Sequence, residues 1–422
     1  MTRARILDAA ATILTERGYA ETRIGDVADL AQMQGPALYY HFASRDDMIE
    51  EVIATGQRAV LAHVQEALAR VGPDPEQRLR AAVAAHLDYV LTTSSYAAAS
   101  IRNFAQLPPD VQERQVALRR EYGAVWRELF ATAATAGFLN PALDVHAARM
   151  LVIGALNWTC EWWDPSRGNP RDLVAAAQAF VHDALTGRTD VAPGEFPPIA
   201  PPAAATAVGE RKSVRSRRRV LEAAAAVLRR RGYAGTRLTD VAREAGMRAA
   251  SLYYHFPSRE DLIEEVVRTG VVITQAHVLT ALETLPATAS PLDRIDRAVE
   301  AHLSFCLSSP DFTVATIRNT GQLPVEMRTR QRAAEAEYGA VWRDLLDAAT
   351  PSGSLGGSPD LHMVRMFVLG ALNQTAEWSD ARRDPGVVVR TARAMVRNAL
   401  APRSRALQDG VEMRPTFLPP SA

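Results

Sequence analysis

The chain has 422 residues, a balanced charge and ordinary apolar and charged fractions, which indicates a globular protein with room for two or more domains. It has no run of about 18 apolar residues and no charged-then-apolar leader, so we expect neither membrane insertion nor secretion. Its two cysteines, Cys160 and Cys306, do not occupy equivalent places in the two halves. We therefore expect buried free thiols in preference to a disulfide framework or a zinc site.

Helical periodicity dominates the first part of the chain. Apolar residues recur at helical spacing from Ile6 to Leu14, and Gly18 is a plausible helix stop. Pro36 suits the first turn of a helix, where its missing N–H is not needed, and Ser44 is a typical N-cap. We expect helices over residues 3–17, 23–31, 35–42 and 44–70, with a turn at 32–34.

The region after residue 76 alternates helical runs with short breakers and has no convincing strand, so the predicted fold class is all-α. Residues 187–212 are rich in Pro and Ala, which predicts an extended linker. Residues 402–422 have no periodicity, which predicts a disordered tail. The helical runs before the linker are 76–93, 96–106, 109–136, 142–163 and 170–186.

The chain repeats itself at the period of a whole domain. Residues 37–42 read Ala-Leu-Tyr-Tyr-His-Phe, and residues 251–256 read Ser-Leu-Tyr-Tyr-His-Phe. Gly-Tyr-Ala, Thr-Arg and Asp-Val-Ala precede each copy, and Ser-Arg with two acidic residues follows it. Glu-Tyr-Gly-Ala-Val-Trp-Arg occurs at both 121–127 and 337–343. Such self-similarity indicates that a complete unit has been duplicated.

These motifs resemble, in order and spacing, the N-terminal helix-turn-helix of the TetR family of transcriptional regulators, present in tandem. The resemblance implies that each unit has a three-helix DNA-binding head and a helical regulatory body. It further implies that the bodies pair through their last two helices, here as a pseudo-dimer within one chain, although two chains could still pair as a homodimer. The implied division is a head at 1–62, a body at 63–186, the linker at 187–212, a head at 213–276, a body at 277–401 and the tail at 402–422.

The two heads differ in charge. Residues 1–62 carry six basic and nine acidic residues, a net charge of −3, whereas residues 210–271 carry fourteen basic and eight acidic residues, a net charge of +6. Because phosphate neutralisation dominates non-specific attraction to DNA, we expect the second head to supply more of the affinity. The turn also differs, because the second head has the usual Gly246 where the first has Gln32, which would need a positive φ.

The third helix of a helix-turn-helix lies in the major groove with its N-terminal residues at the base edges. There, Arg248 can reach guanine or phosphate, and Gln34 can read adenine. One tyrosine of each Tyr-Tyr pair is expected to pack in the core, and His41 and His255 either contact phosphate or cap the helix. The DNA-binding candidates are Thr22, Arg23, Gln34, Tyr39, Tyr40, His41, Ser44, Arg45, Thr236, Arg237, Arg248, Ser251, Tyr253, Tyr254, His255, Ser258 and Arg259.

Polar and aromatic residues on separate helices of the bodies could converge on an internal pocket. Those around Trp162 either contact a ligand or pack in the pairing seam. A resemblance to TetR relatives that sense lipids implies a small apolar or acyl-CoA-like effector. We expect a pocket in each body, larger or more apolar in the first. The candidates are His86, Asn103, Phe104, Trp126, Asn157, Trp162, His302, Asn319, Trp342, Asn373 and Trp378.

The favoured function is an effector-responsive DNA-binding repressor of the cytoplasm, associated with the nucleoid. An alternative is an interaction protein in which only the second head binds DNA. A helical enzyme is less favoured, because the sequence has no Gly-rich phosphate loop, metal-ligand cluster or nucleophile motif. The expected partners are an operator in double-stranded DNA and a small-molecule effector, without a cofactor, a metal or a membrane.

Overall fold

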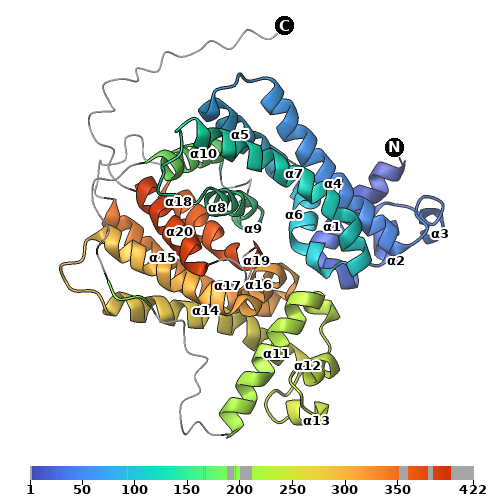
Figure 1. Ribbon diagram of the computed structural model, residues 1–422. Coiled ribbons are helices and arrows are strands. Elements are labelled where there is room, and N and C mark those ends of the chain that lie inside the picture. The colour runs from blue at the N-terminus through green and yellow to red at the C-terminus, as the bar shows by residue number, and fades with distance from the viewer. Residues whose placement is uncertain are drawn as a thin grey trace.

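A computed structural model describes residues 2–92, 94–164, 166, 168–187, 194, 196–199, 212–350, 360–378 and 384–400. No residue in these ranges lies in a β-strand, which confirms the predicted all-α class. Two units with the same helix order lie against each other (Figure 1). None of the described helices combines the length and the apolar character needed to cross a membrane.

The first repeat contains α1 (Thr2–Glu21), α2 (Ile24–Leu30), α3 (Gly35–Leu38), α4 (Arg45–Ala69), α5 (Pro75–Thr92), α6 (Ser94–Asn103), η1 (Phe104–Gln106), α7 (Pro109–Thr135), α8 (Val145–Asn157), α9 (Thr159–Trp162) and α10 (Pro170–Thr186). The second repeat contains α11 (Lys212–Gly235), α12 (Leu238–Glu244), α13 (Ala249–Leu252), α14 (Arg259–Glu283), α15 (Pro291–Ser308), α16 (Pro310–Asn319), η2 (Thr320–Gln322), α17 (Val325–Ala349), α18 (Leu361–Asn373), α19 (Thr375–Trp378) and α20 (Pro385–Leu400). The short 3₁₀ helices η1 and η2 occupy matching places.

The first helix of each head bends at a glycine. Gly18 interrupts α1 with φ of 77°, and Gly232 interrupts α11 with φ of 69°. Glycine adopts a positive φ without the steric cost of a Cβ. The predicted stop at Gly18 is therefore a kink, after which the helix continues to Glu21.

The third helix of each head is a single turn, shorter than the predicted 35–42. The Leu38 carbonyl accepts hydrogen bonds from the N–H groups of His41 and Phe42, at 2.9 and 3.0 Å. This turn returns Phe42 to the core beside Leu38, where both side chains are buried. The Ser44 hydroxyl then accepts from the N–H of Asp47 at 3.1 Å and caps α4, as predicted.

The predicted helix at 142–163 is two helices, α8 and α9. The Thr159 hydroxyl donates to the carbonyl of Leu156 at 2.7 Å, and Thr375 repeats this contact in the second repeat. Such side-chain hydrogen bonds to the backbone compete with continuous helix. The chain therefore turns at Trp158, at the surface where the two bodies meet.

The two bodies pair within the chain. Helices α8 and α10 of the first repeat pack against α18 and α20 of the second, and the buried apolar residues of both bodies form one continuous core. At the crossing of α8 and α18, Gly154 faces Gln374 and Gly370 faces Trp158. A Cβ at either glycine would collide with the facing side chain, so these positions let the helices approach closely. The pairing thus runs through the last long helices of each body, as the resemblance implied.

The heads contact each other and the opposite bodies. Helix α1 packs beside α11, η1 lies on α11 and η2 lies on α1. The Gln322 side chain covers Gly18, and the Gln106 side chain covers Gly232, so closely that a Cβ at either glycine would collide with the amide. Each head therefore rests on the body of the other repeat.

Part of the predicted linker lies along α15. The Gly194 N–H donates to Asp293 at 3.1 Å, and Arg297 donates to the Pro197 carbonyl at 2.6 Å. Residues 188–193, 195 and 200–211 of the predicted linker lie outside the described residues. The predicted disordered tail at 402–422 lies outside them as well.

The last helix of each body is attached differently. In the second repeat, Arg397 of α20 pairs with Asp296 of α15 at 2.7 Å, and both side chains are only 3% exposed. In the first repeat, the equivalent residue of α10 is His182, whose Nε2 lies 3.6 Å from Glu76 and whose side chain is 28% exposed. The second body thus contains a buried ion pair where the first has a half-exposed contact.

Candidate nucleic-acid interface and internal cavity

The third helices, α3 and α13, lie at the outer ends of the heads (Figure 1). Gln34 is the N-cap residue of α3, and Arg248 is the N-cap residue of α13. Both side chains are exposed, and neither has a hydrogen bond or an ion pair with another described residue. Both side chains are therefore free to contact a partner at the positions for which the sequence predicts base-reading residues.

Both tyrosines of each pair are exposed, so the prediction that one packs in the core is wrong. Tyr39 and Tyr40 are 58% and 89% exposed, and Tyr253 and Tyr254 are 59% and 81% exposed. The core position is filled by Phe42 instead. Two exposed phenol rings on the outer surface of each small head are consistent with contacts to another molecule.

The histidines that follow these pairs are half-buried. The rings of His41 and His255 meet Tyr40 and Tyr254 edge-on, at 5.3 and 5.1 Å between centroids. His255 Nε2 also lies 3.1 Å from the Ser216 hydroxyl. The histidines thus stay near the tyrosine surface, and half-buried Ser251 lies on the adjacent turn of α13.

Arg23 and Arg237 precede the second helix of each head. They are the N-cap residues of α2 and α12, and their exposed side chains have no hydrogen bond or ion pair within the described residues. In the second head, Arg215 and Arg219 near the start of α11 are exposed as well. These four guanidinium groups are available to phosphate.

The threonines before these arginines have a different role from the one predicted. Thr22 and Thr236 are 1% exposed. Their hydroxyls donate to the carbonyls of Gly18 and Gly232, at 2.8 and 2.7 Å. A hydroxyl engaged inside the kink cannot grip phosphate, so both threonines are structural and not DNA-contacting.

The Ser-Arg pairs at the starts of α4 and α14 also serve the head itself. Arg45 lies over the Tyr19 ring, 4.4 Å from its centroid, and donates to the Tyr19 carbonyl. Arg259 does the same with Tyr233, at 4.7 Å. Ser44 and its counterpart Ser258 are N-caps that accept from backbone N–H groups. This geometry overturns the prediction of phosphate contacts for the two arginine side chains, because their guanidinium groups face inward.

The turn of the first head has the predicted strain. Gln32 adopts φ of 54°, and its counterpart Gly246 has φ of 61°. Within the described residues, Gln32 is the only non-glycine residue with a positive φ. Because a Cβ disfavours this region, the first head carries a local cost that the second avoids.

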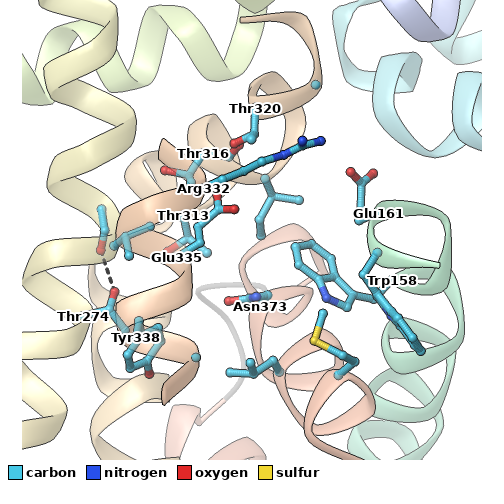
Figure 2. A pocket seen from close by; sticks show the side chains of 18 of the residues that line it. Trp158, Glu161, Thr274, Thr313, Thr316, Thr320, Arg332, Glu335, Tyr338 and Asn373 are labelled. Atoms are coloured by element: carbon cyan, nitrogen blue, oxygen red, sulfur yellow. Dashed lines mark hydrogen bonds between the residues drawn. The ribbon is translucent and has the colours of Figure 1, made fainter. Parts of the chain in front are cut away.

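A cavity of about 590 Å³ lies in the second repeat, within the size range of small-molecule sites. Helices α14 to α18 form most of its wall. Trp158 and Glu161 reach it from the first repeat, opposite Thr316 and Thr320 of the second (Figure 2). The wall is therefore shared by both repeats.

Sequence-family models match both repeats. The model described as "Bacterial regulatory proteins, tetR family" matches residues 6–52 and 220–266. The model described as "Tetracyclin repressor-like, C-terminal domain" matches residues 72–183 and 288–396. The chain belongs to the TetR family. It is a DNA-binding transcriptional regulator in which the whole TetR unit occurs twice.

Individual relatives match one unit at a time. The chain is similar to the HTH-type transcriptional activator FasR of Mycolicibacterium smegmatis, at 28% identity over 194 residues, which cover 45% of this chain and 84% of that protein. It is similar to the HTH-type transcriptional repressor KstR2 of Mycobacterium tuberculosis, at 27% identity over 173 residues, 39% of this chain and 82% of that protein. Among solved structures, the TetR family regulator PfmR from Thermus thermophilus matches at 26% identity with a TM-score of 0.39, covering 42% of this chain and 96% of that one.

One side of the cavity in the second repeat, called its base here, is a hydrogen-bonded polar cluster. His302 Nδ1 lies 2.6 Å from the Tyr338 hydroxyl, and His302 Nε2 lies 3.1 Å from Asn373 Oδ1. Desolvation by burial lowers the pKa of His302 to about 4, so the imidazole is neutral at pH 7. Burial likewise raises the pKa of Tyr338. The base therefore offers uncharged hydrogen-bonding groups.

The charged residues that line the cavity, called its rim here, are mainly cationic, with five arginines against three glutamates. Arg102 and Glu161 form an ion pair at 2.7 Å. Arg332 has no ion pair or hydrogen bond within the described residues, and its guanidinium extends across the cavity toward Glu161 (Figure 2). Burial raises the pKa of Glu335. The rim therefore favours an anion.

Among the predicted ligand residues, only Trp162, His302 and Asn373 line this cavity. Asn103 and Asn319 are fully buried and bond to backbone: the Asn103 Oδ1 accepts from Tyr19 N–H at 3.1 Å. The others do not line it either: His86 and Trp126 pack together, Trp342 is in the core, and Trp378 lies against His146. Asn157 and Phe104 also lie outside this cavity.

The expectation for the first repeat is a pocket that is larger or more apolar than that of the second, and the size is wrong. The cavity found beside Phe138 and His182 of that repeat holds only about 10 Å³, roughly the volume of one water. The sequence candidates did not include Arg332 and Glu335, which line the cavity. Trp158, one of the aromatic residues around Trp162, lies both in the pairing surface and in the cavity wall. The available signal was the set of equivalent positions at which the two repeats carry unlike residues, because duplicated units that take on different roles differ at the residues that serve those roles.

Proposed function

We propose that the chain is an effector-responsive transcriptional repressor that binds an asymmetric operator as a single-chain pseudo-dimer. The observation that carries the proposal is the pair of unlike, exposed third-helix surfaces, with Gln34 on one and Arg248 on the other. Unlike side chains at the base edges prefer unlike half-sites. One chain therefore reads two different half-sites about one helical turn, roughly 34–36 Å, apart.

The candidates that face solvent make the DNA contacts. Gln34, Arg248 and the exposed tyrosines approach the bases, while Arg23 and Arg237 hold phosphate. The half-buried histidines and Ser251 support that surface. The second head supplies more of the affinity because its net charge is +6 against −3 for the first. Repression follows from occupancy alone, since two heads across an operator exclude other proteins from it.

The effector is an amphipathic anion with an apolar body, such as a fatty acid or its acyl-CoA thioester. Trp158, Trp162 and Leu369 offer an apolar wall, and the arginine-rich rim offers an anion-binding entrance. Ligand binding changes DNA affinity only through its different affinity for the two head arrangements. The protein acts in the cytoplasm at the nucleoid.

Genome-wide mapping of DNA bound by the full chain tests this proposal. The expected result is sites with two unlike half-sites, protected by one chain in footprinting and in mass measurements of the complex. Two chains per site, or a perfectly palindromic footprint, would contradict the single-chain reading. Protection of one half-site only would favour the alternative that the acidic first head does not bind DNA.

A further inference from the structure

Equivalent positions in the two bodies are filled unequally. Phe104 of η1 corresponds to Thr320 of η2, and Arg119 of α7 corresponds to Glu335 of α17. The Arg119 guanidinium lies over the Phe104 ring, 4.1 Å from its centroid. The Thr320 hydroxyl instead donates to the Thr316 carbonyl of its own helix at 2.8 Å. In the first repeat, the stacked pair of Phe104 and Arg119 thus occupies the place where Thr320 and Glu335 line a cavity in the second.

Helices α1, α6 and α9 and the residue Trp158 of the first repeat contribute to the cavity of the second. Trp158 packs on Gly370 across the pairing surface and lines the cavity. Thr15 and Glu16 of α1, one helical turn or less before the Gly18 kink, also line it. A ligand in this cavity therefore lies directly against the first helix of the first head. No residue of α11, the first helix of the second head, lines this cavity.

A second connection leads to the same head. Thr320 and Gly321 of η2 line the cavity, and the next residue, Gln322, covers Gly18. The matching contact of Gln106 with Gly232 follows Phe104, which does not line the cavity. The cavity wall is thus continuous with the support of the first head, and it also reaches the second head through Gly270, Val271 and Thr274 of α14.

We propose that one effector binds per chain, in the cavity of the second repeat, and that it acts across the repeat boundary on the position of the first head. This inference rests on the proposed function. It adds the number of effector molecules bound per chain and the head that the effector reaches across the repeat boundary. The first head therefore responds to a ligand that is bound in the other repeat, in addition to the second head, which the ligand meets through α14.

The test uses the full chain and dodecanoate, a carboxylate with an apolar tail. Isothermal titration calorimetry should give one site per chain. Hydrogen exchange followed by mass spectrometry should show a several-fold change at the amides of α1 as well as at those of α14. Two sites per chain would overturn the proposal, as would a change confined to α14 with none in α1.

Two matched double variants locate the site. Thr320→Phe with Glu335→Arg copies the filled pair into the second repeat and should reduce dodecanoate affinity at least tenfold, with the helical circular dichroism retained. Phe104→Thr with Arg119→Glu makes the reverse exchange in the first repeat and should keep the original site. Loss of binding in the second variant but not in the first would place the site in the first repeat and refute the proposal.

These outcomes separate this inference from the proposed function. If dodecanoate does not bind, the ligand class and the inference fail together, while operator binding by the two heads stands on its own mapping experiment. If the chain binds no DNA but takes one dodecanoate and responds in α1, the cross-repeat coupling holds and the repressor function fails. A coupling typical of allosteric proteins would change DNA affinity by about 5–150-fold.

Discussion

The two repeats have the same helices in the same order but different working surfaces. The first repeat has the acidic head, the strained turn at Gln32 and a body filled by Phe104 and Arg119. The second has the basic head, the relaxed turn at Gly246 and a body with a cavity. Once two copies are tied in one chain, neither must perform every task, so one can bind the ligand while the other fills its pocket.

The largest expected difference lies in how the last helix of each body is held. Replacing Arg397 with Ala leaves buried Asp296 with only the more distant Arg393, at 3.8 Å, and we expect a loss of about 3 kcal/mol in the free energy of unfolding. The matched change His182→Ala in the first repeat should cost less than about 1 kcal/mol, because its contact is half-exposed. Urea unfolding of both variants gives the values. Equal losses would show that the two bodies are attached alike.

The buried histidines are a place where the repeats should behave alike. Burial lowers the pKa of both His86 and His302 to about 4, below the usual 6.5. The neutral imidazole stabilises the fold above pH 6.5, and this contribution is lost as the pH falls toward 4. At pH 5 each histidine should cost about 2 kcal/mol of stability.

Stability measured against pH for His86→Gln and His302→Gln tests this expectation. Each variant should flatten the loss of stability between pH 6.5 and 4 by a similar amount. A flattening in only one variant would mean that the buried clusters of the two repeats have also diverged.

The heads should differ in their contribution to DNA binding. Replacing Arg248 with Ala should cost about 1–3 kcal/mol of operator affinity if its guanidinium makes a bidentate contact with guanine. The Gln34→Ala change should cost less, because that head approaches DNA with a net negative charge. Affinities for the mapped operator, measured at one fixed salt concentration, compare the two. Equal losses would mean that the heads contribute equally.

The smallest effect concerns the turns. Gln32→Gly should stabilise the first head by up to about 1 kcal/mol, because glycine removes the Cβ that disfavours a positive φ. The reverse change, Gly246→Gln, should destabilise the second head by a similar amount. Thermal unfolding of the two variants measures both shifts. No change in either would mean that the surrounding structure absorbs the strain.

The sequence predicted the helices and the repeat because these depend on local spacing and on motifs such as Tyr-Tyr-His-Phe. It also identified the strain at Gln32, since one residue type at one turn decides it. It failed where the outcome depends on contacts between distant residues. Arg45 turns inward onto Tyr19, and Trp158 reaches the cavity only because α8 crosses α18 at Gly370. No local pattern contains those distances.

The pairing of α8 and α10 with α18 and α20 inside one chain also affects how the regulator responds to its copy number. In a homodimer, dilution below the dimer dissociation constant removes the DNA-binding species steeply. Partners joined in one chain instead meet at a fixed effective concentration, whatever the number of molecules in the cell. A cell that holds only a few copies of this protein therefore keeps each of them paired, and occupancy of the operator falls in simple proportion to the number of chains.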